Sequence, residues 1–260
     1  MLDSQTAAER WSLTLGEPYD PGVDGHTRRA VLPDGTPAVL KLLRPHRENE
    51  HEADALELWD GDGAVRLLAR DETGYAFLLE RCEPGTHLSS LDADAALDVV
   101  IGLLPRLWKP AGEPFHTLTD EAAWWADYLP KQDWSGEPDL LATALDAIET
   151  LSPTQGEQVL VNQDLHFGNV LAAEREPWLV IDPKPLSGER EFAAAPIVRA
   201  HELGHSKRDV LHRFDRVTSE LGLDRERARG WTIAQTVAWT EDSTRNRTHV
   251  DTARWLLEAA

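Results

Sequence analysis

The chain has 260 residues, enough for one large domain or two lobes with a buried core. Its 26 basic and 46 acidic residues give a net charge of −20, which disfavours nucleic acid and anionic membranes as partners and attracts cationic ligands. No run of 18 apolar residues exists, no basic-then-apolar signal opens the chain, and a single cysteine, Cys82, excludes an internal disulfide, so we expect a cytoplasmic protein.

The N-terminal third is expected to form a small sheet. Strands are predicted at 27–32 and 37–43, with a Pro-Asp-Gly turn between them. Lys41 falls inside the second strand, where its neighbours are nearly all apolar. A charge in such a run needs a partner or a ligand.

A helix is predicted at 48–59, ended by a glycine. Glu52 shares one face of this helix with the apolar residues four and seven positions later, and that face must pack on the sheet. We therefore expect Glu52 to pair with Lys41, and Glu48, one turn earlier, is the alternative.

Two further strands are predicted at 64–69 and 75–80. The Pro-Gly pair that follows breaks the pattern and indicates a linker. We expect the chain to divide there into an N-lobe, residues 1–83, and a C-lobe, residues 84–260.

The C-lobe is mostly helical by its apolar periodicity. The predicted helices are 91–108, 119–129, 140–151, 209–221, 224–240 and 252–260. A small β-rich lobe followed by a larger helical lobe is an α+β arrangement.

The most informative motif is VNQDLHFGNVL at 161–171, followed by WLVIDPK at 178–184. Asp164 and Asn169 are separated by four residues, and two short apolar strands with a polar turn between them predict a hairpin that returns Asp182 to the neighbourhood of Asn169. Enzymes that transfer phosphoryl groups use one carboxylate for the attacking hydroxyl, and an amide oxygen and a second carboxylate for Mg²⁺.

A competing motif is HELGH, in which His201, Glu202 and His205 match the zinc-protease pattern. On a helix both histidines would face one metal, with Glu202 as general base. Gly204 weakens such a helix by about 1 kcal/mol, and the longer zinc-protease pattern does not continue. A second interpretation is that this segment borders the acceptor site.

Residues 162–169 resemble the catalytic loop of the aminoglycoside phosphotransferase superfamily, and the surrounding sequence resembles its streptomycin kinase and hydroxyurea phosphotransferase branch. The stretches that carry this resemblance are AVLKLLRP (38–45), EHEADALELWDGDGAVRLLARD (50–71), LLERCEPGTHL (78–88) and EPWLVIDPKPLSGE (176–189). One departure is Asn162, where the kinase pattern usually has a histidine that hydrogen-bonds nearby backbone; an asparagine can also donate and accept such bonds.

The resemblance implies a protein-kinase-like, two-lobed α+β fold that uses ATP or GTP and Mg²⁺. It implies a nucleotide-binding N-lobe and a C-lobe with the catalytic loop and the acceptor site. It implies that Asp164 is the base or hydroxyl-orienting residue, that Asn169 and Asp182 bind the metal, and that Lys41, held by Glu52, clamps the phosphates. The linker would be the hinge that reads the nucleotide base through its backbone, at Glu80, Arg81 and Cys82.

The function expected from these residues is phosphorylation of a hydroxyl on an aminoglycoside such as streptomycin. The alternatives are a kinase of another small hydroxylated metabolite, of hydroxyurea or sugar type, and a catalytically silent nucleotide-binding protein. We expect a monomer with a cationic small-molecule acceptor and no nucleic-acid or membrane partner. Candidate carboxylates for the acceptor are Glu202 and the pair Glu241-Asp242.

Overall fold

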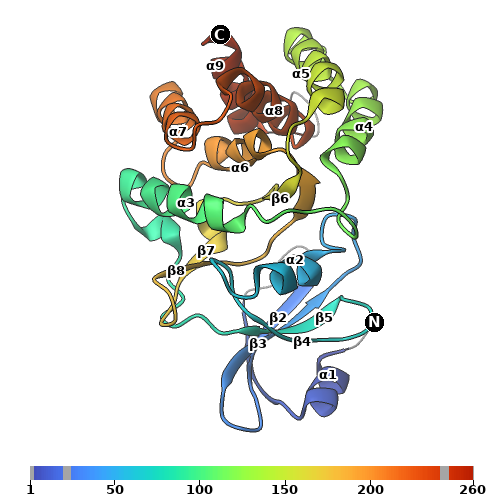
Figure 1. Cartoon of the computed structure of the whole chain (residues 1–260), viewed down its shortest axis with the longest axis vertical. Coiled ribbons are helices and arrows are strands. Elements are labelled where there is room, and N and C mark those ends of the chain that lie inside the picture. Colours follow the sequence, from blue (N-terminus) through green and yellow to red (C-terminus); the bar gives the residue numbers. More distant parts are fainter. Residues whose placement is uncertain (1–2, 20–24, 241–245, 260) are drawn as a thin grey trace. The chain divides into compact units, whose positions relative to one another are not determined.

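The computed structural model describes residues 3–19, 25–240 and 246–259. The chain forms two compact units (Figure 1). The first comprises Met1–His87 and Asn169–Pro185, and the second comprises Leu88–Gly168 and Leu186–Ala260. The segment with the IDPK motif is therefore grouped with the N-terminal sheet, and the division into functional lobes at residue 83 stays a prediction.

The first unit is built on an antiparallel sheet with strand order β1-β2-β3-β5-β4. Its strands are β1 (Thr14–Pro18), β2 (Gly25–Val31), β3 (Pro37–Leu43), β4 (Leu67–Arg70) and β5 (Ala76–Glu80). The other elements of this unit are the helices α1 (Ser4–Trp11) and α2 (Glu52–Trp59) and the hairpin strands β7 (Val170–Ala172) and β8 (Trp178–Val180).

Alternation along β3 decides what each face of the sheet carries. Leu40 and Leu42 lie in a core cluster with Ala7 of α1. Because successive side chains in a strand point to opposite faces, Lys41 lies on the other face, where it meets Glu52 of α2. Helices α1 and α2 thus lie on opposite faces of one sheet (Figure 1).

The second unit is mainly helical. Its helices are α3 (Ala93–Leu107), α4 (Leu118–Tyr128), α5 (Pro138–Leu151), α6 (Ala194–Arg199), α7 (Lys207–Glu220), α8 (Arg225–Ala238) and α9 (Arg247–Glu258). A short two-stranded sheet joins β6 (Val159–Asn162) and β9 (Pro185–Gly188). Helix α8 is buried along most of its length and packs against α5, α6 and α9 (Figure 1).

Aromatic side chains fill the centre of this unit. Phe192 stacks on Trp125, with ring centroids 6.1 Å apart, and meets Trp231 of α8 edge-on at 5.9 Å. All three rings are fully buried, and such pairs stabilise a core beyond the area that they bury.

No helix within the described part of the chain is long and apolar enough to cross a membrane.

Two predicted helices differ from the observed ones by four or more residues at their N-termini. The helix expected from residue 48 begins at Glu52, because the Asn49 side chain bonds backbone at Arg44 and His46 and holds a turn there. The C-terminal helix, expected from residue 252, begins at Arg247, where the Asn246 side chain accepts a bond from the backbone of His249.

Candidate active site

A buried lysine stands at the centre of the candidate site in the first unit. The Lys41 ammonium lies 2.5 Å from Glu52 Oε1 and 2.6 Å from Asp182 Oδ1. Lys41 and Glu52 are almost fully buried, whereas the Asp182 side chain is 51% exposed. The pairing of Lys41 with Glu52 is the one expected from the helix face, and Glu48 instead pairs with Lys184 at 3.2 Å.

The electrostatics of this group are governed by burial and by charge sharing. Burial acts to lower the pKa of Lys41, but the carboxylates of Asp182 and Glu52 outweigh it and hold the pKa above its ordinary value. Burial raises the pKa of Glu52 to about 7, against the opposing effect of Lys41. The Lys41 ammonium therefore stays protonated, because two carboxylates stabilise its charged form.

The hairpin of β7 and β8 brings Asn169 and Asp182 together. Its strands pair antiparallel. Just outside the paired strands, the Ile181 amide donates to the Asn169 carbonyl oxygen at 2.9 Å. Asp182 follows directly with φ of 49°, a left-handed conformation that non-glycine residues seldom adopt. The turn in the backbone directs the Asp182 carboxylate to Lys41.

Arg175, in the turn of this hairpin, anchors it to the rest of the first unit. Its guanidinium donates to both carboxylate oxygens of Glu80, at 2.8 and 2.9 Å, and to the carbonyl oxygens of Gly61 and Ala64, at 2.8 and 2.9 Å. It also bonds Glu176 at 2.8 Å. The hairpin that carries Asn169 and Asp182 is thereby tied to the end of β5 and to the loop after α2.

The first unit also contains a cavity of about 530 Å³. Lys41 and Asp182 line one part of it and residues 80–85 line another. The predicted hinge residues Glu80, Arg81 and Cys82 are thus on this cavity, although the Glu80 carboxylate is occupied by Arg175. Burial raises the pKa of the Cys82 thiol to about 12, so this thiol is unreactive.

In the second unit, the loop that carries Asp164 is held by side chains on both sides. The Asn162 side-chain oxygen accepts a bond from the Asp164 amide at 3.0 Å, so asparagine makes a backbone contact of the kind expected at this position. The buried Arg199, at the end of α6, donates to Asp164 Oδ1 at 3.3 Å. Its guanidinium lies 4.1 Å from the centre of the Trp239 ring, which fixes its position.

The HELGH segment contacts the same loop, and it is not a helix. Glu202 Oε1 lies 2.5 Å from His166 Nδ1 and accepts the Gly168 amide at 3.3 Å. Burial acts to raise the pKa of Glu202, but the bond from His166 outweighs it and the pKa falls to about 2. His205 Nε2 lies 2.9 Å from the carbonyl oxygen of Thr248.

Of the protein carboxylates expected to contact the acceptor, the structure describes only Glu202. Glu202 binds His166 and the loop backbone, in both cases through Oε1, so it helps to hold the loop, and its role as an acceptor contact stays a prediction. The pair Glu241-Asp242 lies outside the described residues.

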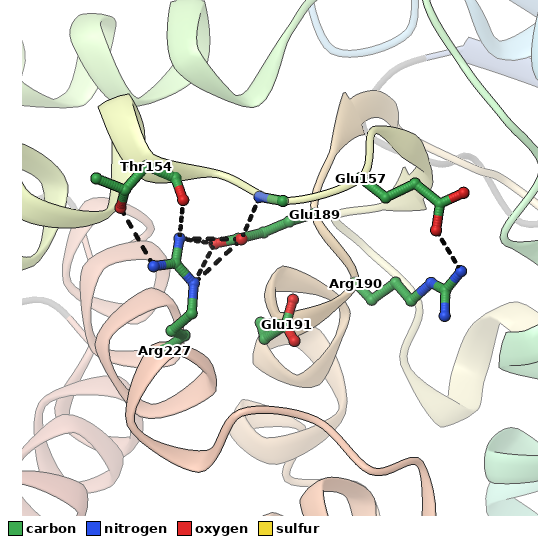
Figure 2. Close-up of a pocket in the computed structure, with 7 residues that line it drawn as sticks. Thr154, Glu157, Glu189, Arg190, Glu191 and Arg227 are labelled. Atoms are coloured by element: carbon green, nitrogen blue, oxygen red, sulfur yellow. Dashed lines mark hydrogen bonds and ion pairs between the residues drawn. The ribbon is translucent and has the colours of Figure 1, made fainter.

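A second cavity, of about 380 Å³, belongs to the second unit (Figure 2). The buried Glu189 receives a bidentate pair from Arg227, the Gly156 amide at 3.0 Å and the Trp231 indole N–H at 2.5 Å. Figure 2 shows the Arg227 guanidinium facing the Glu189 carboxylate. The bonds of the Glu189 carboxylate are thus made to the protein itself. The ion pair of Glu189 with Arg227 links the segment after IDPK to α8 and is structural.

The sequence interpretation missed two arginines, Arg175 in the first unit and Arg199 in the second. Arg175 was assigned only to a polar turn, and its partners lie as far as 114 residues away along the chain. Arg199 carried a readable signal, since it follows the apolar run Ala193–Val198 much as Lys41 lies in an apolar strand.

Solved structures with the same fold include choline kinase LicA from Streptococcus pneumoniae, with a TM-score of 0.69 and 12% identity over 98% of this chain and 97% of that one. The aminoglycoside phosphotransferase APH(4)-Ia has a TM-score of 0.64 and 16% identity over 98% and 94% of the two chains. The expected protein-kinase-like α+β fold is confirmed.

The family follows from sequence. Residues 22–245 match the model of the aminoglycoside/hydroxyurea antibiotic resistance kinases, and the chain belongs to that family. It is 44% identical to a hydroxyurea phosphotransferase of Kitasatospora aureofaciens, over 88% of this chain and 68% of that one. It is 40% identical to a streptomycin 6-kinase of Streptomyces griseus, over 87% and 77% of the two chains. The chain is thus an enzyme, a phosphotransferase that acts on an alcohol group.

Proposed function

We propose that this kinase transfers the γ-phosphate of a nucleoside triphosphate to a hydroxyl of an aminoglycoside of the streptomycin kind. The observation that carries the proposal is the contact of one buried ammonium with both Glu52 and Asp182. A fixed cation beside a half-exposed carboxylate is what a triphosphate site requires. The 40% identity to a streptomycin 6-kinase supports the acceptor class.

In this reaction the acceptor oxygen forms a bond to the γ-phosphorus while the bond from phosphorus to the β,γ-bridging oxygen breaks. The nucleoside diphosphate leaves, and the hydroxyl proton passes to the Asp164 carboxylate. Arg199 donates to this carboxylate and holds its orientation, so that Asp164 can both orient the hydroxyl and accept its proton. Lys41 holds the α- and β-phosphates.

Asn169 and Asp182 fit a magnesium site. Their side chains offer an amide oxygen and a carboxylate, the hard oxygen donors that Mg²⁺ prefers, and the Asp182 carboxylate is open to solvent. When bound, Mg²⁺ supplies positive charge to the phosphate oxygens. ATP and GTP are both compatible donors, and the hinge residues 80–82 would read the base through their backbone.

One observation favours a second acceptor. The identity to a hydroxyurea phosphotransferase, 44%, exceeds that to the streptomycin 6-kinases, 38% and 40%. Hydroxyurea also offers a hydroxyl group, so the same residues would serve both reactions.

Release of nucleoside diphosphate with a panel of acceptors tests the proposal. The panel holds streptomycin, hydroxyurea and a neutral sugar, each with ATP and with GTP in the presence of Mg²⁺. We expect streptomycin to be phosphorylated and Asp164→Asn to lower kcat by about 10²–10⁴-fold while nucleotide affinity stays within about threefold. Turnover of hydroxyurea alone would replace the aminoglycoside by the second acceptor, and full activity of the variant would remove Asp164 from its role.

A further inference from the structure

The cavity of the first unit contains a cation that the proposed roles do not use. Arg29 of β2 lines it together with Lys41 and Arg81. Arg81 pairs with Glu83 at 2.6 Å, and Lys41 pairs with two carboxylates. Arg29 forms no ion pair or hydrogen bond through its guanidinium within residues 3–19, 25–240 and 246–259. Arg29 is an exposed residue on the lining of the cavity, so its guanidinium is open to a ligand that enters there.

Strand register gives the position of Arg29 along the cavity. In the antiparallel ladder Thr27 is opposite Lys41 and Arg29 is opposite Val39, which in turn is opposite Leu79 on β5. Directly opposed residues point to the same face of a sheet. Two residues of strand span about 7 Å, so Arg29 lies one step from the level of Lys41, at the level of Val39 and Leu79.

The chemistry of the cavity changes over that step. At the level of Lys41 the lining is ionic and suits phosphates. At the level of Arg29 the sheet is apolar, with Val39 and Leu79, and the hairpin adds Leu171 and Ile181 to the lining of the cavity. A flat aromatic base fits between such walls, and residues 80–85 border the same end of the cavity.

Arg29 already lies beside an aromatic ring. Its guanidinium carbon lies 5.4 Å from the centre of the Tyr19 ring. A guanidinium is planar and stacks on aromatic faces, and it can do so on both of its sides. The neighbouring Arg28 points to the other face of the strand and donates to the Gly16 carbonyl oxygen at 3.0 and 3.3 Å.

We propose that the Arg29 guanidinium stacks on the nucleobase of the bound nucleotide, with Tyr19 on its other side, and so contributes to donor affinity independently of the phosphates. This proposal rests on the proposed function, because it takes the ligand of the cavity to be a nucleoside triphosphate. It assigns Arg29 to the base, whereas a cation that served the phosphates would act at the level of Lys41.

The test is equilibrium binding of adenosine and of ATP with Mg²⁺, measured by calorimetry, which needs no acceptor. We expect Arg29→Gln to weaken both ligands by the same factor, roughly 3- to 30-fold. Arg29→Lys keeps the charge and loses the plane, so it should also weaken adenosine, while Arg29→Tyr restores a stacking surface and should recover most of the affinity. Arg28→Gln is the matched control on the same strand and should change neither ligand.

Three outcomes would overturn the inference. Unchanged adenosine affinity in Arg29→Gln with weakened ATP would assign Arg29 to the phosphates, especially if Arg29→Lys binds ATP normally. Unchanged affinity for both ligands would remove Arg29 from the site. A wild-type enzyme that binds neither ligand would overturn the nucleotide assignment itself, and the stacking proposal with it.

Discussion

Replacing Arg175 by alanine should destabilise the first unit by about 2–3 kcal/mol. The change removes a bidentate bond to Glu80 and two bonds to the carbonyl oxygens of Gly61 and Ala64. Breaking a fully buried ion pair costs about 3–5 kcal/mol and breaking an exposed one about 0–1 kcal/mol. The Arg175 and Glu80 side chains are 22% and 17% exposed, which places the pair between these limits and nearer the buried one.

The chain offers a matched control in Arg216. Its side chain is also 22% exposed, and it also pairs with several carboxylates, but those of Asp94, Asp98 and Glu220 are 43% to 68% exposed. Arg216→Ala should therefore cost at most about 1 kcal/mol. Urea unfolding followed by tryptophan fluorescence gives both values from the shift of the midpoint and the slope.

A pH series sharpens the test. Burial acts to raise the pKa of Glu80, but the hydrogen bonds from Arg175 outweigh it and leave the pKa below its ordinary value of 4.5. The stabilisation from this pair is therefore present above about pH 4.5 and is lost as the pH falls through the folded-state pKa. The cost of Arg175→Ala should shrink accordingly at low pH. Equal losses in the Arg175 and Arg216 variants at pH 7 would refute the reasoning.

Three further predictions concern the candidate site and its surroundings. Asp182→Ala should abolish the effect of Mg²⁺ on ATP affinity; a magnesium effect of wild-type size would exclude Asp182 as a ligand. Glu202→Gln should lower kcat by about tenfold, because a neutral amide holds His166 in the loop less strongly than a carboxylate does. The acceptor KM and its salt dependence should not change, and a raised KM would make Glu202 an acceptor contact instead. The buried His249 has its pKa lowered to about 4 by burial and by Arg199. Because the unfolded histidine titrates near 6.5, stability is lost between pH 6.5 and 4, by about 2–3 kcal/mol at pH 4.5. Chemical denaturation should find that loss reduced in His249→Gln, and an identical pH dependence would contradict the assignment.

Local arguments predicted those parts of the site whose partners are close in sequence or share an element. Lys41 in an apolar strand required a carboxylate, and helix geometry selected Glu52 over Glu48, as the structure has it. The polar turn between two apolar segments predicted the hairpin that brings Asn169 and Asp182 together. The catalytic roles of these residues stay predictions.

The remaining contacts depend on the tertiary fold. Arg175 and Glu80 are 95 residues apart, and Arg199 and Asp164 are 35 apart. Spacing within one helix or hairpin contains no information about such pairs. A buried arginine predicts that some partner exists, and only the packing of α6 and α8 around the loop determines that the partner of Arg199 is Asp164.

The net charge of −20 predicts a cationic acceptor only where carboxylates near the loop remain unpaired. Around Asp164 the charges occur in pairs: Arg199 donates to Asp164, and Glu202 binds His166 and a backbone amide. A paired charge has little field beyond its own partner, whereas the many exposed carboxylates act over about 10 Å in 0.1 M salt. The overall charge therefore bears on the rate at which a cationic acceptor arrives more than on its affinity.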